Sequence, residues 1–356
     1  MKLRVPVSAT TRGMSASHIP IEGRAGALRL DFNENTVGSS TAALRAVRKL
    51  TAEQLATYPE YLAPTDRMAR WFGVKPNQLA LTNGADGALQ QIVTTFVDRR
   101  SSILLVDPTF VMYRFYAQLS GARTISLRYD SEMQFPVDAV MKALRKSPRL
   151  FLIANPNNPT GTLISPAVIR RMLIAAPRTL FVLDEAYAEF SGVTVLPWIR
   201  RYPNLIVVRT FSKGAGLAGL RLGCMFACPE VTSLLARTRE PFSVNSAAIV
   251  AAEATLRNYR AVTRYAEEIK VARELLASAL IRFGVKIFPS AANFILADFG
   301  AAAPGILRKL AQRRVLLRDR TSDFGRTGYV RVTIGTRAQM RRLISELERI
   351  VLGKKA

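Results

Sequence analysis

The chain has 356 residues, of which 49% are hydrophobic and 22% are charged, which argues against extended disorder and favours one large domain with a smaller one. Its 51 basic and 26 acidic residues give a net charge of +25, which leaves a polyanion-binding protein open as an alternative. Because the basic residues are scattered and form no nucleic-acid-binding motif, we expect no specific nucleic-acid partner.

Beyond an N-terminal arm, residues 1–30, apolar runs alternate with helical patterns. Strands are predicted at 103–107, 124–129, 150–156, 180–187 and 205–212, and helices at 88–97, 112–122, 137–146 and 164–176. Ser165 and Pro166 suit the start of the last of these helices. The alternation predicts right-handed crossovers, and hence an α/β domain with a mostly parallel sheet over residues 31–250.

The pattern changes after about residue 245. A long helical stretch, predicted to break once, extends to residue 284 and is followed by short strands and a final helix. This order predicts a smaller α+β domain over residues 251–356. No apolar run reaches the roughly 18 residues that a membrane-spanning helix requires, so no membrane association is expected.

Thiols and imidazoles are scarce in this chain, which has only Cys224, Cys228 and His18. Two cysteines in one apolar run exclude a disulfide framework and suit a reducing cytoplasm, where we expect the protein to act. One histidine cannot complete a usual zinc site, so no metal is expected. A Ser-His-Asp triad would need His18 as its base.

Polar motifs follow three of the predicted strands. They are NPNNPTG (155–161), DEAY (184–187) and TFSKGAGLAGLRLG (210–223). In an open α/β sheet the carboxyl ends of the strands meet at one edge, and ligands bind there. We therefore expect the three motifs to form one site.

Gly214, Gly216 and Gly219 in the third motif have the G-x-G-x-x-G spacing that, after a strand, is typical of a dinucleotide site. An NAD-dependent oxidoreductase is therefore a second alternative. It is disfavoured because the motif lies deep in the chain rather than in the first βα unit, and no clear acidic residue ends the next strand. The preceding Ser212-Lys213 is also not required for dinucleotide binding.

The chemistry of pyridoxal phosphate (PLP) accounts for the motifs together. This cofactor needs a lysine amine to form an imine, an acid against its pyridine nitrogen and donors for its ring hydroxyl. It also needs a cation and small donors for its phosphate, and commonly has an aromatic ring on one face. The predicted strand ends supply Lys213, Asp184, Tyr187, Asn157, Arg221, Ser212 and Phe110.

The motifs NPNNPTG, DEAY, SKxxGLAGLRxG and RVTIG resemble those of the histidinol-phosphate aminotransferase family, which belongs to the fold-type I aminotransferases. The likeness extends from residue 30 to residue 336. It implies a PLP-dependent aminotransferase with a large PLP-binding α/β domain, a small α+β domain and a homodimer with shared active sites. It also implies glutamate and 2-oxoglutarate as amino donor and acceptor.

The resemblance implies a role for each matching residue. Lys213 corresponds to the imine lysine, which also moves the substrate's proton, and Asp184 to the partner of the pyridinium. Tyr187 and Asn157 correspond to the contacts of the ring hydroxyl. Phe110 corresponds to the stacking aromatic. The implied phosphate cradle consists of Ser212, Arg221 and the turn of Gly84, Ala85 and Asp86.

The resemblance also implies subunit and substrate contacts. Tyr58 corresponds to the tyrosine that reaches the neighbouring subunit's cofactor phosphate. Arg331 corresponds to the arginine that binds the carboxylate of glutamate or the phosphate of histidinol phosphate, and Arg318 to a second phosphate arginine. Asn157 is implied to contact the substrate as well as the cofactor.

The chain departs from the family pattern at three places. The Gly214-Ala215-Gly216 segment replaces a bulky aromatic, so the loop after the lysine is expected to be less filled. Gly87 replaces an acid, and the N-terminal arm lacks a substrate-binding tyrosine. The last departure leaves the substrate open. The alternative is an aromatic or other amino-acid aminotransferase, or an amino-acid phosphate decarboxylase of the same superfamily.

Overall fold

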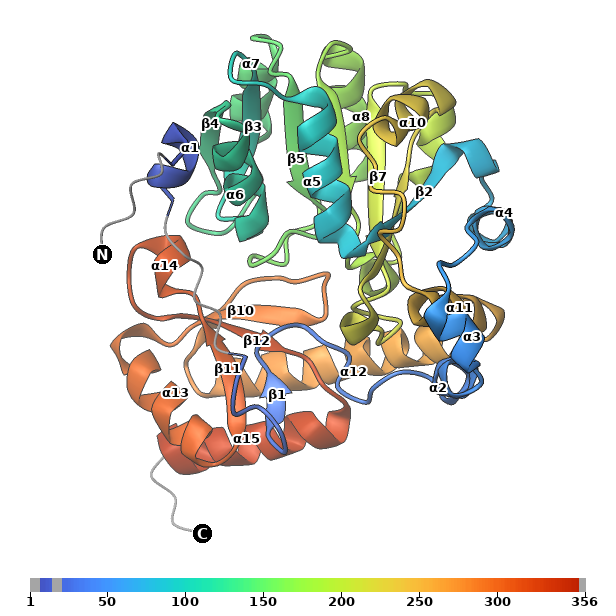
Figure 1. Ribbon diagram of the computed structural model, residues 1–356. Coiled ribbons are helices and arrows are strands. Elements are labelled where there is room, and N and C mark those ends of the chain that lie inside the picture. Colours follow the sequence, from blue (N-terminus) through green and yellow to red (C-terminus); the bar gives the residue numbers. More distant parts are fainter. Residues whose placement is uncertain (1–6, 15–20, 352–356) are drawn as a thin grey trace, which may run out of the picture.

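Two sheets form the framework of the protein and lie one above the other in Figure 1. The computed structural model describes residues 7–14 and 21–351, so His18 lies outside the described residues. The larger sheet has seven strands in the order β2-β8-β7-β6-β5-β3-β4. Their bounds are Leu79–Asn83 (β2), Ser102–Asp107 (β3), Arg123–Arg128 (β4), Leu150–Ala154 (β5), Leu180–Asp184 (β6), Leu205–Thr210 (β7) and Leu222–Phe226 (β8).

Every strand pair of this sheet is parallel except the two pairs that β8 makes with β2 and β7. The mostly parallel sheet predicted from the sequence is therefore confirmed, with all five predicted strands in place. Strands β2 and β8 are not predicted from the sequence. The residues of β8 form an apolar run around Cys224, which is buried in the core.

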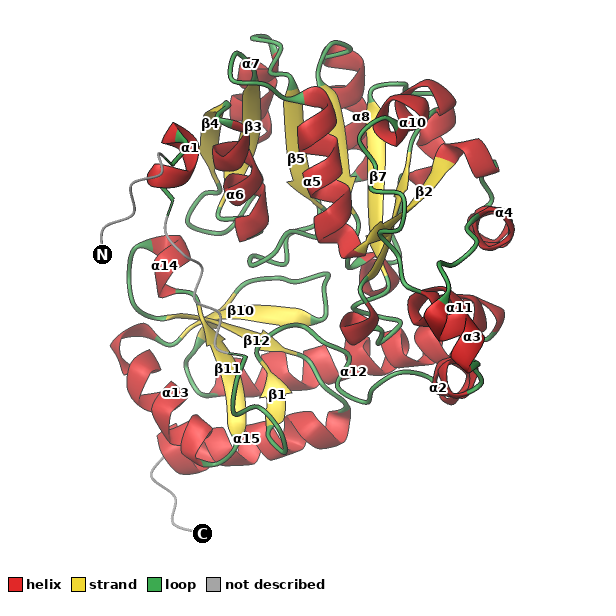
Figure 2. Cartoon of the chain, viewed as in Figure 1, coloured by secondary structure: helices red, strands yellow, loops and turns green. Residues whose placement is uncertain are grey.

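Helices cover both faces of the large sheet, as Figure 2 shows. One face packs against α5 (Gly84–Phe96), α6 (Val111–Ser120) and α10 (Pro229–Ala236), and the other against α7 (Val137–Leu144) and α8 (Pro166–Ala175). Successive residues of β3 alternate between the two cores, since Leu104 packs on one side and Leu105 on the other. As predicted, Ser165 caps α8 by accepting a hydrogen bond from the backbone N–H of Val168.

Several further helices complete the part of the chain around the large sheet. They are α1 (Ala9–Arg12), α2 (Thr41–Arg48), α3 (Ala52–Ala56), α4 (Leu62–Phe72), α9 (Ala188–Ser191) and α11 (Ser246–Arg257). Helix α11 packs against α2 and α4, beside the β2 edge of the sheet. The predicted long helical stretch does break once, at Asn258 and Tyr259, between α11 and α12.

The second sheet has five strands in the order β1-β11-β12-β10-β9. They are Leu28–Leu30 (β1), Val315–Asp319 (β11), Tyr329–Thr333 (β12), Phe294–Asp298 (β10) and Lys286–Ile287 (β9). The associated helices are α12 (Arg260–Arg282), α13 (Ala303–Gln312), α14 (Thr321–Phe324) and α15 (Arg337–Val351). Apolar residues of α12, α13 and α15 share one core with this sheet.

Strand β1 joins the beginning of the chain to its C-terminal third. It pairs in parallel with β11, with Leu28 opposite Val315 and Leu30 opposite Leu317. Part of the predicted N-terminal arm is therefore a strand of the second sheet. The division into residues 31–250 and 251–356 stays a prediction.

Two searches of the described residues gave no candidates. Among residues 7–14 and 21–351, no helix is both long and apolar enough to cross a membrane. Within the same ranges, no group of three or more histidine, cysteine, aspartate or glutamate side chains is arranged to hold a metal ion.

Candidate active site

A cavity of about 710 Å³ lies between the two sheets. The large sheet contributes Ala154, Asp184 and Thr210, the last residues of β5, β6 and β7. The second sheet contributes Arg318 of β11 and Arg331 of β12. Residues of all three polar motifs line this cavity. The fold thus brings the motifs together, as expected at the carboxyl ends of parallel strands.

Lys213 follows β7 and lines the cavity. Its Nζ donates a hydrogen bond to the carbonyl oxygen of Phe32, 3.0 Å away. Burial, and then the nearby charge of Arg331, lower the pKa of this amine to about 8. A larger fraction of Lys213 is therefore neutral and nucleophilic near neutral pH than for an exposed lysine.

Asp184 ends β6 as a buried carboxylate in the cavity wall. It accepts hydrogen bonds from the Tyr113 hydroxyl at 2.9 Å and from the Ala186 backbone N–H at 3.0 Å. Burial raises the pKa of Asp184 to about 6, although both hydrogen bonds oppose this shift. A cationic partner in the cavity would therefore favour its ionised form. The sequence analysis did not identify Tyr113.

Tyr187 lines the cavity with its hydroxyl held in place. This oxygen accepts a hydrogen bond from Asn33 Nδ2 at 3.0 Å, and Asn33 Oδ1 accepts one from the Thr333 hydroxyl at 3.0 Å. Asn33 follows β1 and Thr333 ends β12, so the second sheet orients a residue of the DEAY motif.

The two adjacent asparagines of NPNNPTG, Asn157 and Asn158, point to different places. Asn157 Nδ2 donates to the carbonyl oxygen of Pro108 and to the Thr160 hydroxyl, both at 2.9 Å, so both of its amide hydrogens are engaged in holding the turn. Asn157 is not among the residues that line the cavity, whereas Asn158 is. Asn158 Oδ1 also accepts a hydrogen bond from Arg331 at 2.6 Å. The structure therefore places Asn158, rather than the expected Asn157, against the cavity.

The expected phosphate cradle lies at the N-terminus of α5. Ala85, Asp86, Ser212 and Arg221 line the cavity there. Arg221 donates to Asp86 at 2.7 Å and to the Ser212 hydroxyl at 3.4 Å. Gly84 begins α5 with φ +67°, a conformation that favours glycine. Free backbone N–H groups at a helix N-terminus, with an arginine beside them, form an anion-binding arrangement.

Phe110 lines the cavity and meets Tyr113 edge-on, with ring centroids 5.7 Å apart and an interplanar angle of 88°. Phe32 is a second aromatic residue in the lining, and the guanidinium of Arg318 lies 5.4 Å from its ring centre. Phe32 and Phe110 therefore give the cavity an aromatic part of its lining.

The guanidinium of Arg331 is buried and only partly satisfied. Its Nη1 donates to Asn158 and its Nη2 to the Asp31 carbonyl oxygen, each at 2.6 Å, while Nε has no partner among the described groups. Burial, followed by the charge of Arg320, lowers the pKa of Arg331 to about 9. Arg320 also lines the cavity and was not identified from the sequence.

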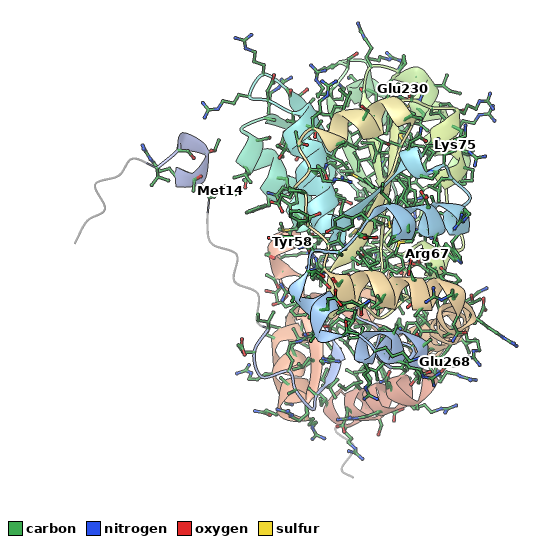
Figure 3. All side chains as sticks on the ribbon, turned by 45° about the vertical axis from the view of Figure 1, so that its right-hand side comes forward. Met14, Tyr58, Arg67, Lys75, Glu230 and Glu268 are labelled. Carbon is green, nitrogen blue, oxygen red and sulfur yellow. The ribbon has the colours of Figure 1, made fainter. Side chains whose placement is uncertain are left out.

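Tyr58 lies outside the cavity of its own chain. It is 73% exposed, and Figure 3 labels it on the surface, in the segment between α3 and α4. Its ring stacks on Phe242, with centroids 3.8 Å apart. Of the residues expected at the site, Tyr58 and Asn157 are thus the two whose side chains lie away from the cavity lining.

The glycines after Lys213 serve the loop rather than a dinucleotide. A 3₁₀ turn (Ala218–Leu220) and the antiparallel strand β8 follow them, so the helix that a dinucleotide site requires does not follow. Gly216 has φ +71°, and a Cβ there would lie 2.6 Å from the carbonyl oxygen of Gly38. Ala215 within this loop is buried in the core, and the expectation of a less filled loop stays a prediction.

Comparison with known proteins gives the same picture. Residues 25–347 match the family model of aminotransferase class I and II. The chain is 34% identical to histidinol-phosphate aminotransferase 1 of Carboxydothermus hydrogenoformans, over 91% of this chain and 93% of that protein. It is 36% identical to histidinol-phosphate aminotransferase of Moorella thermoacetica, over 91% and 85% of the two chains.

Solved structures resemble it over similar lengths. Histidinol-phosphate aminotransferase of Sinorhizobium meliloti, in complex with pyridoxal 5'-phosphate, matches with a TM-score of 0.86 and 25% identity, over 98% of both chains. L-threonine-O-3-phosphate decarboxylase of Porphyromonas gingivalis matches with a TM-score of 0.80 and 26% identity, over 91% of this chain and 99% of that one. The chain therefore belongs to the aminotransferase class I and II family, whose members depend on pyridoxal phosphate.

Proposed function

We propose that this aminotransferase exchanges an amino group between histidinol phosphate and 2-oxoglutarate, as a step of histidine biosynthesis. One observation carries the proposal: a single cavity is lined by Lys213 and Asp184 from the large-sheet side and by Arg318 and Arg331 from the second sheet. The first pair suits amino-group transfer and the second suits a phosphorylated substrate. The names of the relatives that match over most of the chain support the same substrate.

The residues around Lys213 fit PLP. Lys213 would hold the aldehyde through its amine, and Asp184 would face the pyridine nitrogen with its carboxylate, since both line the cavity. The N-terminus of α5, Ser212 and Arg221 would donate hydrogen bonds to the phosphate. When bound, PLP supplies an aldehyde and an electron-withdrawing ring that stabilises negative charge at the substrate's Cα.

Within that site the chain's own residues hold charge and move a proton. Asp184, backed by the Tyr113 hydroxyl, holds a negative charge in a buried position, where electrostatic stabilisation is strong. Lys213 Nζ, neutral above about pH 8, takes a proton from the substrate's Cα and later returns one. Tyr187 and Asn158 line the cavity and are each fixed by a second side chain, so Tyr187, with Asn158 in place of the expected Asn157, would contact the ring hydroxyl.

Gly223 tests the shape of the phosphate cradle. It lies on β8, and a Cβ there would come within 2.5 Å of the backbone carbon of Gly84. We expect Gly223→Ala to lower the free energy of unfolding by about 1–3 kcal/mol and to weaken PLP binding, because the Gly84 turn must move. Thermal unfolding and PLP titration measure both effects. Gly219→Ala is the control, since nothing lies within 4 Å of its Cβ position. Equal behaviour of the two variants would contradict the close approach.

The substrate assignment is tested by turnover with 2-oxoglutarate as acceptor. Histidinol phosphate is expected to give a kcat/KM at least about 100-fold above that of phenylalanine, because its phosphate can engage Arg318 and Arg331 together, whereas phenylalanine offers only a single carboxylate. The reverse preference would favour an aromatic aminotransferase. Release of CO₂ from an amino-acid phosphate would favour the decarboxylase alternative, in line with the likeness to the Porphyromonas gingivalis enzyme.

We further propose a homodimer in which each copy completes the other's active site. Leu55, Tyr58, Leu62 and Phe242 are 68%, 73%, 85% and 53% exposed, which is unusual for such apolar side chains. On either side of Phe242 in the chain, Arg239, Glu240 and Ser243 line a second pocket of about 480 Å³ that also includes Asp86 and Arg221. This pocket offers a route by which Tyr58 of one copy reaches the phosphate cradle of the other.

Mixing two inactive variants tests the shared site. Lys213→Ala and Tyr58→Ala are each expected to have little activity alone. When the two are unfolded and refolded together, roughly a quarter of wild-type activity is expected, because half of the dimers are mixed and each mixed dimer has one intact site. The control is a mixture of Lys213→Ala with Asp184→Asn, which places both changes in the same cavity. If Tyr58 acts within its own chain, the mixture of Lys213→Ala with Tyr58→Ala regains no more activity than the control mixture.

We place this reaction in the cytoplasm. Cys224 and Cys228 are both buried free thiols, as suits a reducing compartment.

A further inference from the structure

Three arginines from the second-sheet side line the cavity. The family resemblance accounts for two of them, Arg318 and Arg331. The third is Arg320, which lines the same cavity and whose side chain is 11% exposed. Its backbone N–H donates to the carbonyl oxygen of Tyr329 on β12, at 2.9 Å. The two strands that carry Arg318 and Arg331 therefore also fix Arg320.

The positive charges of these three arginines are not balanced by nearby acidic side chains. Asp323, in contact with Arg320, is the single acidic side chain within ion-pair distance of any of the three arginines in the described part of the chain. Three guanidinium groups against one carboxylate leave two positive charges uncompensated. The Nε atoms of Arg320 and Arg331 are also buried without a hydrogen-bond partner among the described groups. Buried charges of one sign are costly unless an anion binds between them.

Two further features indicate a place for that anion. Arg331 and Arg320 are 5% and 9% exposed, so bulk water screens them little. Burial lowers the pKa of Arg320, and burial together with the charge of Arg320 lowers that of Arg331. The charge of Arg320 thus makes Arg331 harder to keep charged, and the charge of Arg318 does the same to Arg320, a conflict that a bound dianion relieves.

We propose that Arg320 is a third anion-binding residue of the substrate site and makes it selective for substrates whose distal group carries two negative charges, as a phosphate monoester does. This inference rests on the proposed function, because it assigns the substrate's distal group to this cavity. A neutral ring leaves both uncompensated charges in place, and a single carboxylate leaves one.

The carboxylate of Asp323 competes with a bound phosphate for Arg320. This carboxylate contacts Arg320 from α14, one turn further along the chain. An incoming phosphate must share or replace this carboxylate to reach Arg320. Removing the negative charge of Asp323 therefore strengthens phosphate binding, whereas removing the positive charge of Arg320 weakens it. A pair that served only to hold the loop would lose function in both variants.

The experiment titrates inorganic phosphate into the PLP-loaded enzyme by calorimetry and measures KM for histidinol phosphate. Arg320→Gln is expected to weaken phosphate binding and raise KM by about 10- to 100-fold, with a much smaller effect on phenylalanine. Asp323→Asn is expected to tighten phosphate binding by roughly 3- to 10-fold. Arg326→Gln is the matched control, because this exposed arginine of the same region pairs with Asp298 at 2.6 Å and does not line the cavity.

The outcomes separate this inference from the proposed function. Unchanged phosphate affinity in Arg320→Gln, or an affinity in Asp323→Asn that is not tightened, overturns the role of Arg320. If Arg320→Gln does not fold, the Asp323→Asn result alone decides. If the three proteins bind inorganic phosphate with the expected order of affinities but histidinol phosphate does not donate its amino group to the wild-type enzyme, the proposed substrate is wrong and the role of Arg320 stands. If it turns over histidinol phosphate with the same KM in Arg320→Gln, only this inference fails.

Discussion

Replacing Lys213 with alanine is expected to lower transamination by roughly 10⁴-fold or more, because the change removes both the amine that holds PLP and the base that moves the proton at Cα. Borohydride reduction of the wild-type holoenzyme is expected to fix PLP on the peptide that contains Lys213, which mass spectrometry identifies. The Lys213→Ala protein should carry no fixed cofactor after the same treatment.

Two controls separate chemistry from folding. Among the described residues, the Lys213 side chain makes one hydrogen bond, to the Phe32 carbonyl oxygen, so the alanine variant without cofactor should unfold at nearly the same temperature as the cofactor-free wild type. A small primary amine added to this variant should restore part of the activity, since it can act as the missing base. Retention of near wild-type turnover by Lys213→Ala would show that the chemistry occurs elsewhere.

The second large effect is expected for Asp184→Asn. Loss of the negative charge against the pyridine nitrogen should lower kcat by about 10²- to 10³-fold, the size seen when one electrostatic group of an active site is removed. The shape of the side chain is kept, so KM should change much less. Single-turnover rates with saturating substrate measure the effect directly. A variant within 10-fold of the wild type would contradict the role given to Asp184.

The same substitution should make the cofactor-free protein more stable above pH 6. Burial raises the pKa of Asp184 from 3.8 to about 6, so the folded state binds a proton more tightly than the unfolded state. The wild-type protein therefore loses stability as the pH rises between about 4 and 6, on the order of 3 kcal/mol in total, and the amide of the variant has no such titration. Denaturant unfolding at pH 5 and pH 8 should show that the variant gains relative to the wild type at the higher pH.

The sequence predicts five strands of the large sheet and misses β1, β2 and β8. The five predicted strands of the large sheet are long apolar runs, and all are present. Strand β1 has three residues and gains its stability from pairing with β11, almost 290 positions away, which local patterns cannot reveal. Family, fold and cofactor followed from motifs whose spacing the chemistry requires, and the comparisons confirm them.

Within the site, the residues that touch the cofactor were easier to predict than those that orient them. Tyr113 stands three positions after Phe110 at the start of α6, so helical spacing could have placed both near one site. Arg320 stands two positions after Arg318, and a strand's two-residue period could have placed them on one face. Asn157 and Asn158 are adjacent in a proline-rich turn, and only the folded backbone decides which one faces the cavity. The site roles, the homodimer and the domain division stay predictions.

The most direct test of the account is a half-reaction on the purified, PLP-loaded enzyme. Histidinol phosphate added without an acceptor should shift the cofactor's absorbance within one turnover, and 2-oxoglutarate added afterwards should restore the original spectrum. Phenylalanine at the same concentration should give a much slower change, and Lys213→Ala none. A spectrum that histidinol phosphate leaves unchanged while phenylalanine converts it would contradict the proposed substrate. A protein that shows no PLP absorbance at all would contradict the assignment of Lys213.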